Sequence, residues 1–178
     1  MYDIGIREIE IPDRIVETDH ITYLAHSIKH PYKCRNCGKR KYLVPHGGYN
    51  KNLQDIKRDG KQVYIQLRIN RYRCSSCNKT SSDIDRLTFF KKRSKLTNRL
   101  KEEIAYEIIS GKTFYEIANV YDIEHDTVKA IMESYAKEHK KCFDYKGTPE
   151  ILGISDVCIG GHSRLVLADL KKKTPYRY

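Results

Sequence analysis

A Cys-x-x-Cys pair that occurs twice is the feature that most constrains what this chain can fold into. Cys34 and Cys37 form the first pair, Cys74 and Cys77 form the second, and 36 residues lie between the pairs. A tetrahedral zinc ion takes four ligands, and each such turn aims two sulfurs at one point. Four thiolates close the coordination shell, so the ion would hold the fold together and perform no chemistry. We therefore expect one structural zinc ion per chain.

Two alternatives to this site stay open. The pairs could be redox centres or disulfides, although a redox Cys-x-x-Cys normally occurs singly and in front of a helix, unlike either pair here. A nearby histidine, His30 or His46, could replace one cysteine as a ligand. Gly38 and Asn78 follow the two pairs, and both residue types tolerate the left-handed backbone that such a turn favours.

Positive charge is concentrated in one segment of the chain. Residues 34–96 hold 17 Lys and Arg against 4 Asp and Glu, an excess of 13, whereas the net charge of the whole chain is +11. Charge this dense repels itself unless a polyanion neutralises it, and nucleic acid is the usual polyanion. A solvated, lysine-rich surface is the alternative. The charge therefore favours a nucleic-acid-binding protein.

Length and hydropathy exclude several other classes. The 178 residues suffice for one or two small domains, and 39% of them are hydrophobic. No apolar run approaches the roughly 18 residues that a membrane span needs. The N-terminus also lacks the basic and then apolar layout of a signal peptide. We expect a soluble cytoplasmic protein, a setting in which paired cysteines bind metal more often than they form disulfides.

The first 96 residues indicate strands followed by a linker. Residues 21–28 favour a strand, Asp59-Gly60 is a tight-turn signal, and residues 63–70 alternate apolar and polar side chains as a half-buried strand does. Residues 81–96 show no strand or helix period and are basic. We therefore assign residues 1–80 to N-terminal strands plus a zinc ribbon, and residues 81–96 to a basic linker.

From residue 97 the apolar residues follow a helical period. Gly111 ends the first helix, Thr113 can cap a second one, and Asp122 takes the turn position that is usually glycine. Two short helices joined by a tight turn predict a helix-turn-helix within residues 97–146. A three-helix packing module that does not touch DNA is the alternative.

Beyond residue 146, two short apolar stretches flank Gly160-Gly161 and predict a β-hairpin. The order of parts is then zinc ribbon, basic linker, helix-turn-helix and hairpin. That order resembles the ISL-three family of insertion-sequence transposases. The firmest points of the resemblance are the two cysteine pairs, Arg71-Tyr72-Arg73-Cys74, Thr127-Val128-Lys129 and residues 153–169. It covers nearly the whole chain, although only the cysteine pairs are specific by themselves.

The resemblance implies a function in two parts. In that family the N-terminal modules bind the terminal repeats of the element, and a ribonuclease H-like domain cuts and joins DNA with a carboxylate triad and divalent ions. The first catalytic aspartate of the family follows a glycine and an apolar residue, and this chain has Ser155 there. The other carboxylates would lie beyond Tyr178. We therefore expect residues 147–178 to be a truncated start of that domain and the chain not to be an enzyme.

The sequence thus predicts an α+β fold with a β-rich zinc ribbon, a helix-turn-helix three-helix unit and a C-terminal β-hairpin remnant of a ribonuclease H-like sheet. The predicted function is DNA binding by a truncated or decayed transposase. We expect duplex DNA as the partner, no membrane and no small-molecule substrate, and a homodimer stays open. The alternatives are a transcriptional regulator, or an RNA-binding accessory protein that uses Tyr64 and Tyr72.

The candidate DNA contacts fall into two groups. Cations of the basic segment would contact phosphate, and side chains at the start of the third helix would face the bases. The first group is Lys39, Arg40, Lys41, Arg68, Arg71, Arg73, Lys91, Lys92 and Arg93. The second group is His125, Asp126 and Lys129. No catalytic residue is predicted.

Overall fold

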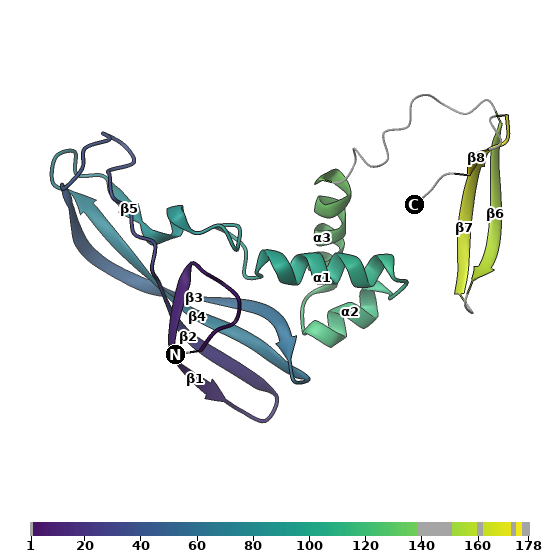
Figure 1. Cartoon of the computed structure of the whole chain (residues 1–178), viewed down its shortest axis with the longest axis horizontal. Coiled ribbons are helices and arrows are strands. Elements are labelled where there is room, and N and C mark those ends of the chain that lie inside the picture. The colour runs from purple at the N-terminus through teal and green to yellow at the C-terminus, as the bar shows by residue number, and fades with distance from the viewer. Residues whose placement is uncertain (1, 139–150, 160–161, 172–173, 176–178) are drawn as a thin grey trace. The chain divides into compact units, whose positions relative to one another are not determined.

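The computed structural model has an α+β fold and divides into two compact units, residues 1–104 and 105–178 (Figure 1). It describes residues 2–138, 151–159, 162–171 and 174–175. The first unit contains a mixed five-stranded sheet. Three α-helices follow the sheet among the described residues. The expected α+β class is confirmed.

Strand β4 is the centre of the sheet, whose strand order is β1-β2-β4-β3. β1 (Ile9–Val16) pairs antiparallel with β2 (His20–Ser27), and β2 pairs parallel with β4 (Lys61–Cys74). β3 (Leu43–Arg58) forms a long antiparallel hairpin with β4. Beyond the end of β2, the short β5 (Thr80–Ser82) pairs with the C-terminal end of β4. β4 therefore runs from the core of the sheet to the second cysteine pair.

The alternation in residues 63–70 builds one face of the core. Val63, Ile65, Leu67 and Ile69 are fully buried, whereas the residues between them lie on the other face. The predicted Asp59-Gly60 turn joins β3 to β4. Both of its residues have positive φ, 51° and 75°, as a type I′ hairpin turn requires. The strand and the turn are thus confirmed.

Residues 81–96 do not form the expected basic linker. They contain the short 3-10 helix η1 (Asp83–Arg86), and Ile84, Leu87 and Phe90 are buried in the same core as the sheet. These apolar residues recur at every third position of an irregular segment. That spacing is neither the period of a strand nor that of an α-helix. The periodicity of the sequence therefore could not predict that this segment packs into the core.

A buried carboxylate holds this segment to the N-terminus. Glu8 accepts hydrogen bonds from the N–H and the hydroxyl of Thr88, each at 2.7 Å, and from Lys29 Nζ at 2.6 Å. Burial alone would raise the pKa of Glu8, but these donors together lower it below its ordinary value. Two segments 80 residues apart in the sequence are joined in this way.

A second buried carboxylate fixes the start of the first helix. Asp55 of β3 is fully buried; it accepts bonds from the Thr97 hydroxyl and from Arg99 Nε, both at 2.7 Å, and Arg99 Nη2 contacts its other oxygen. Thr97 also accepts a bond from the N–H of Leu100 and so caps α1 (Asn98–Ile109). The start of α1 is therefore part of the first unit, which ends at Ile104.

The next two helices have the predicted local geometry. α2 (Phe114–Tyr121) begins with a capping box between Thr113 and Glu116, and Asp122 after it is left-handed, with φ 52° and ψ 53°. α3 (His125–Glu138) follows this turn. Buried side chains on the two helices are Ile117, Tyr121, Val128 and Ile131.

The C-terminal hairpin is present as predicted. β6 (Leu152–Ile159) and β7 (His162–Asp169) pair antiparallel in an unbroken register, and β8 (Thr174–Pro175) pairs with the end of β7. The Gly160-Gly161 turn and the boundary expected at residues 146 and 147 lie outside the described residues.

Replacing Asp55 by alanine should destabilise the protein by about 3 kcal/mol, because Arg99 loses the buried acceptor of its guanidinium. The measurement is denaturant unfolding of the zinc-loaded protein, followed by circular dichroism. The matched control is Asp85→Ala. Asp85 also binds two cations, Arg35 and Lys92, but both are exposed, so we expect a loss below about 1 kcal/mol. Equal losses for the two variants would contradict the role given to Asp55.

Candidate metal centre and nucleic-acid interface

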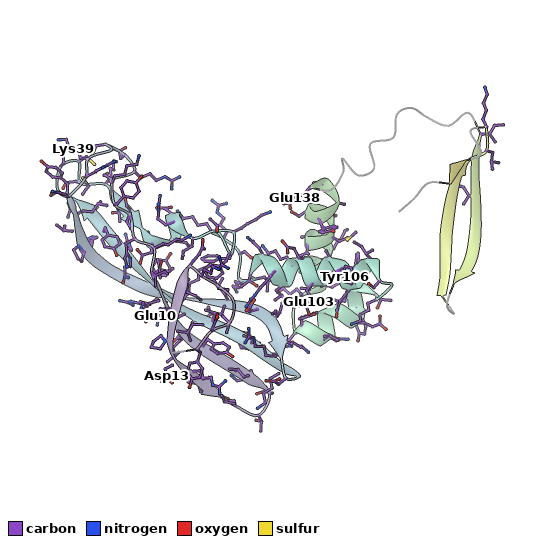
Figure 2. All side chains as sticks on the ribbon, in the orientation of Figure 1. Glu10, Asp13, Lys39, Glu103, Tyr106 and Glu138 are labelled. Carbon is purple, nitrogen blue, oxygen red and sulfur yellow. The ribbon has the colours of Figure 1, made fainter. Side chains whose placement is uncertain are left out.

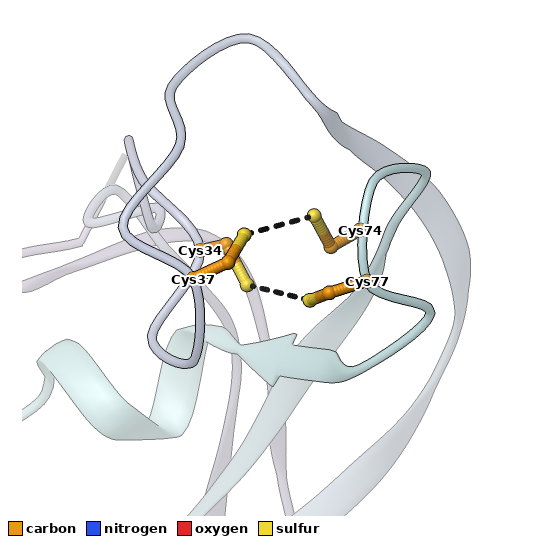
Figure 3. A group of neighbouring side chains, drawn as sticks. All are labelled: Cys34, Cys37, Cys74 and Cys77. Atoms are coloured by element: carbon orange, nitrogen blue, oxygen red, sulfur yellow. Dashed lines mark hydrogen bonds between the residues drawn. The ribbon is translucent and has the colours of Figure 1, made fainter.

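The two cysteine pairs face each other at the end of the β3–β4 hairpin that lies away from its turn. Cys74 is the last residue of β4, and Cys34 lies in the connection between β2 and β3. Figure 3 shows the four side chains pointing toward one another from two turns. The Sγ atoms of Cys34 and Cys77 are 3.6 Å apart, and those of Cys37 and Cys74 are 3.7 Å apart. All four Sγ atoms lie within 4.8 Å of one another.

These separations suit one tetrahedral metal ion. With Zn–S bonds of about 2.3 Å, sulfurs at the corners of a tetrahedron are about 3.8 Å apart. Thiolate ligands favour zinc over magnesium or calcium, and four of them leave no position open for a substrate. The four predicted ligands therefore form one cluster that can hold a metal ion, consistent with a structural zinc site.

The two turns share one backbone design. Gly38 and Asn78 are left-handed, with φ of 71° and 57°, and each donates its N–H to the carbonyl of the first cysteine of its pair, Cys34 or Cys74. The N–H of each first cysteine donates in return to a lysine carbonyl, at 2.9 Å in both turns. The expected tolerance of Gly38 and Asn78 for this conformation is thus used in both turns.

The environment of the cluster shifts the pKa values of two of its thiols in opposite directions. The N–H of Lys79 and the neighbouring thiols lower the pKa of Cys77 to about 6. The N–H of Lys39 acts in the same direction on Cys37, but burial and the other three thiols outweigh it and raise the pKa of Cys37 to about 11. A metal ion that enters the cluster must therefore displace protons, and its affinity falls as the pH is lowered.

The histidines considered as substitute ligands are not part of the cluster. His30 Nδ1 lies 2.9 Å from the buried Asp83 and 3.1 Å from the hydroxyl of Tyr72. His46 is exposed on β3. A second group of possible ligands, Glu17, Asp19 and His20, is largely exposed, and its own ion pairs account for its geometry. The sulfur-only ligand set is therefore the one that the structure supports.

The predicted phosphate contacts are mostly exposed, but they do not lie on one face. Arg68 and Arg71 are three residues apart on β4, so their side chains leave opposite faces of the strand. Lys92 pairs with Asp85 at 3.1 Å, and Lys39 donates to Ser76. Lys91 also has an interaction partner. Arg68 donates to Asn50. Within the described part of the chain, the other five members form neither an ion pair nor a side-chain hydrogen bond: Arg40, Lys41, Arg71, Arg73 and Arg93.

The predicted base-reading residues lie together at the start of α3. His125, Asp126 and Lys129 are all exposed, and the ring of His125 packs against that of Phe114 with centroids 5.7 Å apart. Asp126 and Glu133 make this helix poor in positive charge. The turn between α2 and α3 is left-handed at Asp122, whereas the charge of α3 does not favour phosphate.

One group near the metal centre was missed by the sequence analysis. The ring of Tyr32 has three cations around it: Arg86 at 5.2 Å, Arg40 at 5.6 Å and Lys33 at 5.7 Å from its centroid. A tyrosine beside a lysine just before a cysteine pair was the available signal. This local signal could not indicate Arg86, which lies more than 50 residues away at the end of η1.

Comparison of the chain with protein-family models, curated proteins and solved structures finds no match. Among the described residues, no helix is both long enough and apolar enough to cross a membrane.

Purified protein should contain one zinc ion per chain, and Cys74→Ser should reduce this content to well below one. The ribbon should unfold while α2 and α3 persist, because the metal would close only the first unit and these two helices lie in the second. Elemental analysis and circular dichroism are the measurements, and zinc should also be released on acidification. Cys142→Ser is the control, since Cys142 stands outside both pairs. Wild-type protein with little zinc, or equal zinc in the two variants, would refute the site.

Proposed function

We propose that this chain binds duplex DNA, and that the zinc-stabilised first unit supplies most of the affinity. The observation that carries the proposal is the excess of positive charge in residues 34–96, together with exposed arginines there that have no carboxylate beside them among the described residues. Unneutralised cations at fixed positions attract a polyanion and release its counterions on binding. Without such a partner, the repulsion between these cations would only lower the stability of the folded domain.

The metal centre supports this proposal through geometry. Arg71 and Arg73 lie on the part of β4 that ends at Cys74, and Arg40 and Lys41 directly follow the first cysteine pair. A metal ion that joins the two turns would hold these cations at fixed separations. Cations that are already in place lose less conformational entropy when they bind phosphate.

The helices have a secondary role in the proposal. The left-handed Asp122 between α2 and α3 is compatible with a helix-turn-helix, and base reading by His125, Asp126 and Lys129 remains a prediction. Since α3 is poor in cations, phosphate affinity is assigned to the first unit. In the ISL-three transposases, which the chain resembles, the N-terminal modules bind DNA at the terminal repeats of the element.

Single-strand binding through Tyr64 and Tyr72 is not favoured. Tyr64 is half-buried with its ring against His20, at a centroid distance of 5.6 Å. Tyr72 is half-buried and its hydroxyl contacts His30. Stacking with an unpaired base needs an open ring face. Duplex DNA is therefore the proposed partner.

We also propose that the chain has no strand-cutting activity of its own. The resemblance gives the first catalytic position to Ser155, which pairs with Val166 in β7. Adjacent residues of a regular strand alternate between faces, and only a bulge would bring the next residue, Asp156, to the same place. The register of β6 with β7 has no such bulge. A hydroxyl is a poor substitute for a carboxylate ligand of a divalent ion.

Affinity for a labelled DNA duplex should fall about 500-fold between roughly 50 and 200 mM salt, which is the expectation for about five phosphate contacts. Replacing both Arg71 and Arg73 by glutamine should flatten the log–log salt dependence by about 1.8. Fluorescence anisotropy of the full chain measures both effects. Lys112→Gln is the control, because Lys112 pairs with Glu107 in the helical part of the chain. A single strand that binds more tightly than the duplex in the same salt would contradict the proposal.

Incubation of the protein with supercoiled plasmid and either Mg²⁺ or Mn²⁺ should produce no nicked or joined DNA. The reason is that Ser155 supplies no carboxylate at the family's first catalytic position. Gel electrophoresis of the plasmid is the measurement. Nicking that co-purifies with the protein and disappears in Asp156→Ala would contradict this prediction, because Asp156 would then act as the first catalytic carboxylate.

A further inference from the structure

Three cations from three parts of the chain converge on one exposed tyrosine beside the metal centre. Tyr32 is 52% exposed, and Lys33, Arg40 and Arg86 lie between 5.2 and 5.7 Å from its ring centroid. Each distance is within the range in which an aromatic ring attracts a cation. We call these four residues the Tyr32 cluster.

The fold holds the Tyr32 cluster in place at its backbone. Lys33 and Arg40 are partners in an antiparallel β-bridge that flanks the first cysteine pair. Arg86 ends η1, whose first residue, Asp83, is fully buried. Asp83 accepts bonds from the N–H and side-chain amide of Asn70, at 3.0 and 2.9 Å. The backbone of each of the three cations is therefore fixed, in the β-bridge or at the end of η1.

The charge of the Tyr32 cluster is not neutralised within the described part of the chain. Neither Lys33 nor Arg40 nor Arg86 pairs with a carboxylate there. The adjacent Asp85 is already shared by Arg35 and Lys92. Like charges gathered around one ring repel one another, and an anion among them would remove that cost.

We propose that the Tyr32 cluster is a phosphate-binding site for the backbone of nucleic acid. Two of its three cations are guanidinium groups, which bind phosphate oxygens through paired N–H donors. Tyr32 acts as the positioning residue that gathers the cations. The inference rests on the proposed DNA binding and deepens it, because it assigns affinity to Tyr32, Lys33 and Arg86, which composition alone did not select.

Nucleic acid fits the Tyr32 cluster better than an acidic peptide does. A second ring beside the first cysteine pair repeats the arrangement: Tyr42 is 45% exposed, with Lys39 Nζ at 5.4 Å from its centroid. Cations beside half-exposed aromatic rings suit the backbone of a DNA duplex, which presents phosphates and sugars in turn. Carboxylates of a peptide would satisfy the cations but would leave the rings without a partner.

The test measures duplex affinity and its salt dependence for four variants of the full zinc-loaded chain. Arg86→Gln and Tyr32→Leu should each weaken binding about eightfold near 100 mM salt, and Arg86→Gln should lower the slope of the log–log plot by about 0.9. Tyr32→Phe keeps the ring and should bind as the wild type does. The matched control is Arg14→Gln, because Arg14 lies 4.6 Å above the ring of Tyr2 and no other cation of the described segments lies over that ring.

The control site is distant from the Tyr32 cluster. Figure 2 labels Asp13, the neighbour of Arg14, at the end of the sheet opposite to Lys39. If Arg86→Gln and Tyr32→Leu bind DNA as Arg14→Gln does, the inference is wrong while DNA binding stands. If the wild type binds no DNA at low salt, the proposed function fails with it. If poly-glutamate displaces DNA from the wild type but not from Arg86→Gln, the site takes acidic peptides and the inference is overturned.

Discussion

The four-sulfur cluster is the interaction on which the first unit depends. It joins the loop that follows β2 to the end of β4, two parts of the chain that are far apart in sequence. The matching turns at Gly38 and Asn78 present the four sulfurs at separations that one metal ion can close. Without that closure, the long β3–β4 hairpin would end in two loops that carry dense positive charge and repel each other.

Three buried carboxylates connect the rest of the first unit. Glu8 joins the N-terminal segment to Thr88, Asp55 joins β3 to Arg99 at the start of α1, and Asp83 joins η1 to Asn70 of β4. A buried carboxylate is costly unless its oxygens accept several hydrogen bonds, which makes each of these contacts specific in position. The same network delivers Arg86 to Tyr32, so the candidate phosphate site is a consequence of how the sheet is packed.

Several local features were predictable because they depend on nearby residues. The capping box of Thr113, the left-handed turn at Asp122 and the Asp59-Gly60 hairpin follow from short-range spacing. The four-cysteine cluster follows from a short motif that occurs twice. The prediction of a linker at residues 81–96 was wrong because the burial of this segment depends on distant residues. Its buried residues are recognised only through partners that lie far away in the sequence, and no local period reports them.

The sequence by itself determined the members of the four-cysteine cluster, the α+β class and the concentration of charge in residues 34–96. These properties depend on residue type, on local spacing and on the repetition of one short motif. Only the tertiary structure decided the parallel pairing of β2 with β4 and which cations lie beside an acid. It also decided that Arg40 and Arg86 meet at one ring. Such contacts depend on the path of the chain between distant segments, and the free energy of packing the whole core selects that path.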